Sequence, residues 1–218
     1  MNTESVKLSS KQIIHNLSEN DYNIIYEMTE LFSQLSKDRQ SRELRNYLND
    51  HNITSKEVYN WLLNNQNDSN AVYLLGIFNY LGIEVCVNKR KAFELYQKAV
   101  NLGNVFAMSS LGNFYKLGIG TSVNEQKAFE LYQKAADLGN ATGMNNLGIC
   151  YEDGIGTNID KQKAFELFQN AADLGNALGI NNLAYCYEKG IGTNIDNQKA
   201  FELYQKATNL FQLYFLNL

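Results

Sequence analysis

The chain has 218 residues and contains no proline, three cysteines and two histidines. A chain of this length and average composition would carry roughly 11 prolines. Polyproline linkers, PxxP docking segments and proline-kinked helices are therefore excluded. Cys86, Cys150 and Cys186 form no CxxC pair, and His15 and His51 lie far from them in the sequence. We expect reduced thiols, no metal site and no cofactor.

Charge is also low and evenly mixed. Lysine and arginine number 19 against 23 acidic residues, which gives a net charge of −4 without a basic cluster. Nucleic acid and anionic lipid are therefore not expected as ligands. The amino terminus is polar, and the longest apolar run, residues 71–78, is far shorter than the roughly 20 residues that span a bilayer. We expect a soluble, cytoplasmic protein without membrane insertion.

Glycine is absent from residues 1–69 but strictly spaced afterwards. All 15 glycines lie between Gly76 and Gly192, and each falls on one of five positions of a 36-residue period. The segment Lys-Ala-Phe-Glu-Leu follows the same period, beginning at Lys91, Lys127, Lys163 and Lys199. A fixed period of this size is typical of a solenoid built from stacked repeats.

One period predicts two helices. Apolar residues recur at helical spacing from about residue 140 to 153, and Gly154 stands where a left-handed residue would end a helix. Asp160 is a good N-cap for a second helix over about residues 161–174. The first repeat has Glu84 where the others have glycine, so its inter-helix loop is expected to differ.

Residues 1–69 lack the period but keep a helical pattern of apolar residues. Thr54 and Glu57 form a capping box at the start of one predicted helix. We interpret residues 41–65 as a divergent helical hairpin that covers the amino-terminal end of the array.

The pattern Leu-Gly-x-x-Tyr-x-x-Gly-x-Gly, followed by Lys-Ala-Phe-Glu-Leu-Tyr-Gln-Lys-Ala-Ala, resembles the Sel1-like repeat family over residues 70–207. The resemblance implies a right-handed α/α superhelix related to tetratricopeptide arrays. The sequence thus predicts an all-α fold: an α/α superhelical solenoid of four 36-residue helix-turn-helix repeats behind an amino-terminal helical cap. The expected divisions are 1–69 for the cap and about 70–104, 105–140, 141–176 and 177–218 for the repeats.

The resemblance also implies a function, that of a non-catalytic adaptor or scaffold whose partner is another protein. A second implied function is a regulatory or targeting module, because the chain is similar to fungal arrays that follow a kinase-like signalling domain. Bacterial members linked to β-lactam hydrolysis have a pair of cysteines in every repeat, whereas this chain has at most one, and it has no Ser-x-x-Lys. We expect no enzymatic activity and no catalytic residues.

If the first helices line the concave face, as the resemblance implies, two positions per helix form a mixed strip of amide, hydroxyl and apolar groups. Such a strip suits an extended peptide or a helix of another protein. An equally weighted interpretation is a compositional bias, since asparagine occurs 30 times in the chain. The strip residues are Tyr73, Ile77, Ser109, Asn113, Asn145, Ile149, Asn181 and Tyr185.

The carboxyl-terminal residues 210–218 are apolar on nearly all sides and contain no glycine. Three interpretations are open. The last helix continues past Ala207 and lays Phe211 and Phe215 over the fourth repeat, the tail is buried by self-association or by a partner, or the array is a piece of a longer one. We favour the first interpretation combined with self-association.

Overall fold

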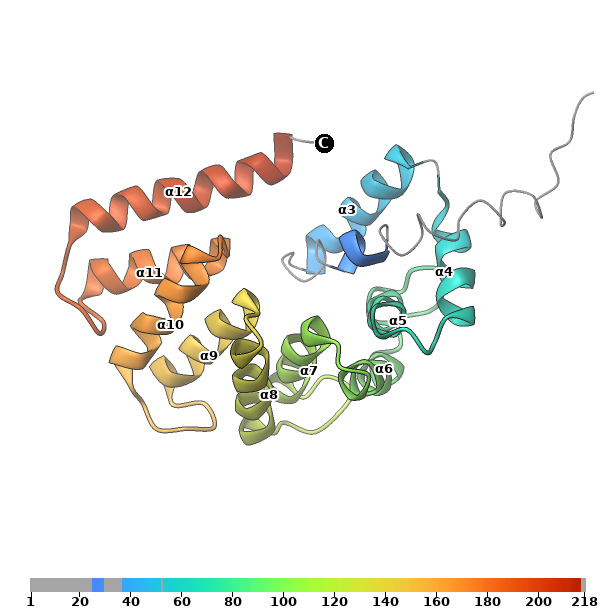
Figure 1. Cartoon of the computed structure of the whole chain (residues 1–218), viewed down its shortest axis with the longest axis horizontal. Helices are drawn as coiled ribbons and strands as arrows, with labels where there is room; N and C mark the ends of the chain where they lie inside the picture. Colours follow the sequence, from blue (N-terminus) through green and yellow to red (C-terminus); the bar gives the residue numbers. More distant parts are fainter. Residues whose placement is uncertain (1–24, 30–36, 52, 217–218) are drawn as a thin grey trace, which may run out of the picture.

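A computed structural model describes residues 25–29, 37–51 and 53–216 of the chain, without the side chains at 37–39, 41 and 211–216. Within these residues every regular element is a helix. Figure 1 shows the helices following one another along an arc, with α4 (Ser55–Asn64) near one end and α12 (Asn197–Leu216) at the other.

Each repeat contributes a first and a second helix. The first helices are α5 (Ser69–Leu81), α7 (Val105–Leu117), α9 (Ala141–Asp153) and α11 (Ala177–Lys189). The second helices are α6 (Lys89–Asn101), α8 (Glu125–Asp137), α10 (Lys161–Asp173) and α12. The predicted α/α solenoid of four repeats is confirmed.

The helices start where side-chain oxygens can accept backbone N–H groups. Asp160 caps α10 by accepting from the Lys163 N–H at 3.0 Å, as predicted. Asn140 caps α9 in the same way, accepting from the Gly143 N–H at 2.7 Å. Asparagine or aspartate fills the corresponding site of every helix from α5 to α12. These caps satisfy donors that the helix itself leaves unpaired.

The turn between the two helices of a repeat needs left-handed backbone. Gly154 ends α9 at φ +75°, and Gly156 follows at φ +66°. The prediction that the first loop differs at Glu84 is wrong for the backbone, because Glu84 adopts φ +60°. What differs is the neighbour. A Cβ on Gly156 would lie 2.4 Å from the Glu125 carbonyl oxygen of the preceding repeat. Glu84 instead faces α4, where the Ser55 hydroxyl donates to its carboxylate.

A second set of glycines lets the helices of one repeat approach each other. A Cβ on Gly148 of α9 would come within 2.6 Å of the Phe168 ring of α10, and Phe168 is fully buried. The fourth repeat has Ala184 at the position of Gly148, and Tyr204 at that of Phe168. There the aromatic side chain is only half-buried, and its hydroxyl donates to Glu188 at 2.9 Å.

Aromatic pairs join one repeat to the next. The phenylalanine of each Lys-Ala-Phe-Glu-Leu segment meets a tyrosine of the following first helix edge-on, with centroids 5.3–5.5 Å apart. Edge-to-face pairs of this kind stabilise by about 1 kcal/mol beyond the area that they bury. The pairs are Phe93–Tyr115, Phe129–Tyr151 and Phe165–Tyr187.

The amino-terminal helices are α3 (Lys37–Asp50) and α4. The predicted capping box is present, with Thr54 and Glu57 each accepting from the other's backbone N–H. Helix α4 packs on α5, where the rings of Tyr59 and Phe78 stack at 6.0 Å. Of the helical pattern expected upstream, only residues 25–29 are described and helical; residues 1–24 and 30–36, with His15, lie outside the described residues.

The last helix continues as predicted. Helix α12 has 20 residues and ends at Leu216, whereas the other second helices have 13. The expected contacts of Phe211 and Phe215 lie outside the described side chains.

Candidate protein-binding surface

The first helices of neighbouring repeats touch one another directly: α7 contacts α9, and α9 contacts α11. In a curved stack the elements approach most closely on the inner side. The first helices therefore line the concave side of the arc seen in Figure 1.

The predicted strip lies on this side, but only part of it is accessible. Tyr73, Ile77, Ser109 and Asn145 are buried. Asn113 and Ile149 are half-buried, while Asn181 and Tyr185 of α11 are exposed. The expectation of a continuous accessible strip through all four repeats is thus not met.

Three of the four buried strip residues join one first helix to the next first helix or to its N-cap. The Tyr73 hydroxyl lies 3.2 Å from Ser110 Oγ in the next repeat, and Ser109 Oγ donates to Asn140 Oδ1 at 3.0 Å. Asn145 Oδ1 accepts from Asn182 Nδ2 at 2.8 Å. Because repeats approach most closely on the inner side, these side chains meet the next first helix and not solvent.

The capping asparagines of the first helices add hydrogen bonds between successive first helices, a line of contacts that we call the seam. Besides capping α7, Asn104 donates from Nδ2 to Asn70 Oδ1 of α5 at 2.7 Å. Asn176 caps α11 and donates to Thr142 Oγ1 at 3.4 Å. This role between successive first helices accounts for some of the asparagine, for which a compositional bias was one of two equally weighted interpretations. The sequence does contain an indication of this role, because Asn104, Asn140 and Asn176 follow the 36-residue period.

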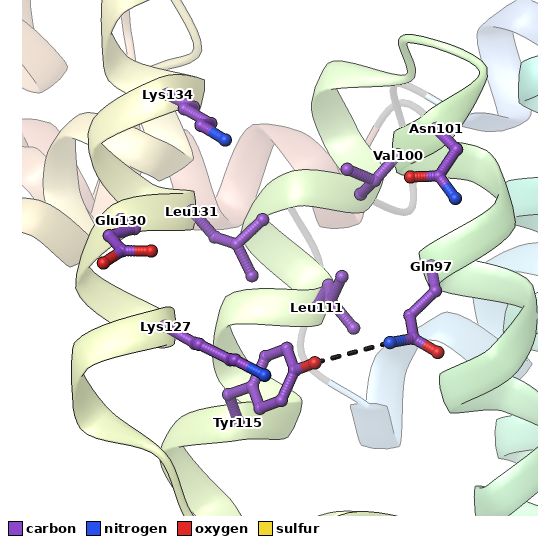
Figure 2. Close-up of a pocket in the computed structure, with 9 residues that line it drawn as sticks. All are labelled: Gln97, Val100, Asn101, Leu111, Tyr115, Lys127, Glu130, Leu131 and Lys134. Carbon is purple, nitrogen blue, oxygen red and sulfur yellow. Dashed lines mark hydrogen bonds between the residues drawn. The ribbon is translucent and has the colours of Figure 1, made fainter.

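On the opposite side, a groove of about 380 Å³ lies between the second helices α6 and α8, with α7 as its floor (Figure 2). The sequence did not predict it. Gln97 Nε2 donates to the Tyr115 hydroxyl at 3.4 Å, and Lys127 Nζ lies 5.2 Å from the centre of the Tyr115 ring. The lining residues are Gln97, Val100, Asn101, Leu111, Tyr115, Lys127, Glu130, Leu131 and Lys134.

In the later repeats the equivalent side chains form different hydrogen bonds. Gln133 donates to Asp137 at 2.8 Å, and Lys163 Nζ donates to the Tyr151 hydroxyl at 2.7 Å. The groove has Asn101 at the position of Asp137, so Gln97 lacks this carboxylate partner and reaches Tyr115 instead. The replacement also removes a negative charge, which leaves two lysines against one glutamate in the groove.

The cysteines follow the expectation of unpaired thiols. Cys150 and Cys186 are buried and Cys86 is exposed. Burial raises the pKa of Cys150 to about 11 and that of Cys186 to about 12. Among the described residues, no three His, Cys, Asp or Glu side chains gather to hold a metal ion, and none of the helices is long and apolar enough to cross a membrane.

The described helices define an α/α solenoid of the tetratricopeptide-like class. Residues 69–104, 105–140, 141–176 and 177–210 each match the Sel1 repeat. The chain belongs to the Sel1 repeat family, whose members are generally protein-interaction scaffolds. No curated protein matches the chain significantly.

Two solved structures are similar to it. A Sel1 repeat protein from Oxalobacter formigenes has 26% identity and a TM-score of 0.68, over 79% of this chain and 71% of that one. The protein c5321, a protective antigen of uropathogenic Escherichia coli strains that displays an SLR fold, has 27% identity and a TM-score of 0.63. That match covers 72% of this chain and 33% of c5321, so the chain spans about a third of that protein.

Proposed function

We propose that the chain is a non-catalytic protein-interaction scaffold that binds a peptide or a helix of another protein on its first-helix side. The observation that carries the proposal is an exposed stripe on α11. Leu178, Asn181 and Tyr185 share one helix face, and the two large apolar members are 51% and 42% exposed. The spacing of i, i+3 and i+7 places them in line along two turns.

This stripe has the chemistry that extended or helical ligands need. Leu178 and Tyr185 offer apolar anchors at either end, and the Asn181 amide between them both donates and accepts hydrogen bonds. Lys189 Nζ lies 6.0 Å from the centre of the Tyr185 ring. Half-buried Ile149 continues the apolar surface on α9. The partly buried Asn145–Asn182 hydrogen bond joins α9 to α11, the two helices that carry this surface.

The proposal of a non-catalytic role rests on the state of the reactive groups. Cys150 and Cys186 have pKa values far above neutrality, so both thiols are protonated and unreactive at pH 7. His51 directly follows α3, where its Nδ1 is 2.8 Å from the Tyr47 carbonyl oxygen and its ring stacks on Tyr47. Neither arrangement pairs a nucleophile with a base.

The role of a regulatory module in a kinase-like signalling protein stays a prediction from sequence resemblance. The neighbouring coding sequence tests it directly. A kinase domain immediately upstream would support this role, and a scaffold function would then serve that enzyme.

The test is selection of short random peptides displayed on phage against the full chain, followed by titration of the selected peptides. Tyr185→Ala and Asn181→Ala are each expected to weaken binding about tenfold, or about 1.4 kcal/mol. Leu117→Asp is a matched control, because Leu117 is exposed and the third repeat has Asp153 at the same position. Peptides that bind both α11 variants as tightly as they bind the parent would contradict the proposed site. Loss of binding in Lys127→Glu instead would assign the ligand to the groove of Figure 2.

A further inference from the structure

The second helices present one face to the following repeat, and in α12 this face is uncovered. In α10 the face includes Lys161, Phe165 and Ala172. Tyr187 meets Phe165 edge-on, the backbone of Gly192 approaches Lys161 closely, and that of Gly179 approaches Ala171 and the adjoining backbone of Ala172. The equivalent residues of α12 are Asn197, Phe201 and Thr208. Together with Gln205, one helical turn after Phe201, we call them the terminal face.

Exposure shows how open the terminal face is. Phe201 is 58% exposed, whereas its counterpart Phe93 in the first repeat is 6% exposed. Gln205 and Thr208 are exposed as well, and Ala172, the counterpart of Thr208, is buried. A large aromatic ring that three internal junctions cover with a tyrosine thus meets solvent at the fourth repeat.

The charges around the terminal face permit close approach of an identical surface. None of its four residues is charged. Glu202 and Lys206 stand one helical turn apart along one flank, and both are exposed. Since their charges are opposite, an antiparallel copy of α12 can set Glu202 of each chain against Lys206 of the other. The flank is therefore complementary to itself, as a two-fold interface requires.

At the amino-terminal end of the array, α5 cannot form the Phe–Tyr contact that joins internal repeats. The position of Tyr115, Tyr151 and Tyr187 is occupied by Asn79 in α5. Asn79 is buried, and its side chain donates to the Leu75 carbonyl oxygen at 2.8 Å. Helix α4 already covers α5. Because α5 offers no tyrosine to a Phe201 ring, head-to-tail stacking of chains lacks its aromatic contact.

We propose that a second copy of this chain covers the terminal face, with the two α12 helices packed antiparallel about a two-fold axis. The Phe201 rings are buried near the centre of this interface, and Glu202 pairs with Lys206 on its flank. With 20 residues, α12 is about 30 Å long, which gives the pair a longer contact than a 13-residue helix could offer. The closed first repeat ends the assembly at a dimer.

Sedimentation equilibrium of the full chain over a range of concentrations tests the proposal without any other ligand. The parent is expected to form dimers, and Phe201→Asp is expected to weaken the dimer at least tenfold. Leu117→Asp, an equally exposed apolar residue outside the terminal face, is expected to leave the dimer unchanged. Far-ultraviolet circular dichroism checks that both variants keep the parent's helicity.

A charge exchange tests the antiparallel pairing. Glu202→Lys and Lys206→Glu are each expected to weaken the dimer, and the double variant is expected to restore it. A double variant as weak as the singles would overturn the antiparallel arrangement. A parent that is monomeric at every concentration, or a dimer indifferent to Phe201→Asp, would overturn the proposal and leave the face to a different protein or to a further repeat. Peptide binding at α11 is measured separately, so either proposal can fail alone.

Discussion

The ring of Phe93 in α6 meets the ring of Tyr115 in α7 edge-on, with centroids 5.3 Å apart and an interplanar angle of 85°. Phe93 belongs to the first repeat and Tyr115 to the second, so this contact joins two repeats. The same pair recurs at the next two junctions. Because a solenoid is stabilised largely by such neighbour contacts, the pair gives the phenylalanine of the first three Lys-Ala-Phe-Glu-Leu segments a structural role.

Equivalent phenylalanines are expected to differ sharply in their contribution to stability. Phe93→Ala removes a buried ring and is expected to cost about 3 kcal/mol. Phe201→Ala removes an exposed ring and is expected to change the free energy of unfolding by less than about 0.5 kcal/mol in the monomer. Urea titrations at a protein concentration too low for association measure both. Equal losses would contradict the difference in exposure between the two rings.

Gly156 and Glu84 occupy the same position of the repeat. Substitutions at the two sites are expected to change the free energy of unfolding in opposite directions. Gly156→Ala places a Cβ at φ +66° and 2.4 Å from the Glu125 carbonyl oxygen. The loss should exceed the roughly 1–2 kcal/mol that left-handed backbone alone costs an L-residue. Glu84→Gly removes an exposed hydrogen bond from Ser55 but relieves the backbone strain at φ +60°, and it is expected to stabilise by up to about 1 kcal/mol. Thermal melts of the two variants give the signs, and a stabilising Gly156→Ala would show that the loop is placed wrongly.

Two asparagines of the predicted strip are expected to differ in role. Asn145 stabilises the fold, whereas Asn181 is exposed and available for binding. Asn145 is 2% exposed and hydrogen-bonded to Asn182, so Asn145→Asp places a charge in a buried site and is expected to cost at least about 1–3 kcal/mol. Asn181→Asp on the exposed face of α11 is expected to stay within about 0.5 kcal/mol of the parent. Chemical denaturation compares them. A parent-like Asn145→Asp would mean that the seam between the third and fourth repeats is open to water.

The raised pKa values of the two buried thiols predict that the folded chain loses stability at alkaline pH. The folded chain holds the pKa of Cys150 near 11 and that of Cys186 near 12, against an ordinary value of 9.0. Between pH 9 and 11 the unfolded chain loses these protons while the folded chain keeps them. Unfolding is therefore favoured as the pH rises through this range, and the contribution is fully present below pH 9.

Serine variants provide the control for this pH dependence. In Cys150→Ser combined with Cys186→Ser, the fall of the melting temperature from pH 9 to 10 should be smaller than in the parent. Alkylation at pH 8, followed by mass spectrometry of the native protein, is expected to modify exposed Cys86 before the two buried thiols. An identical pH dependence of the parent and the double variant would exclude the thiols as its cause.

Much of the fold is local and was accessible from sequence. Gly154 ends a helix because left-handed backbone favours glycine, and Asp160 starts one because its carboxylate accepts a backbone N–H; both requirements act within a few residues. The 36-residue period predicted the four helix pairs for the same reason. Each copy satisfies the same local rules, and the stack then follows from burying apolar faces that no single copy can bury alone.

The accessible surface, by contrast, was decided by tertiary contacts. Ser109, Asn145 and Asn181 occupy one position of the repeat, yet the first two are buried and the third is exposed. Residue type does not separate Asn145 from Asn181; what separates them is whether another first helix lies alongside. The same reason exposes Phe201 while Phe93 is buried. A repeating sequence determines the fold of each unit, but whether a given side chain contacts solvent depends on its neighbours in space, which the pattern within one repeat does not encode.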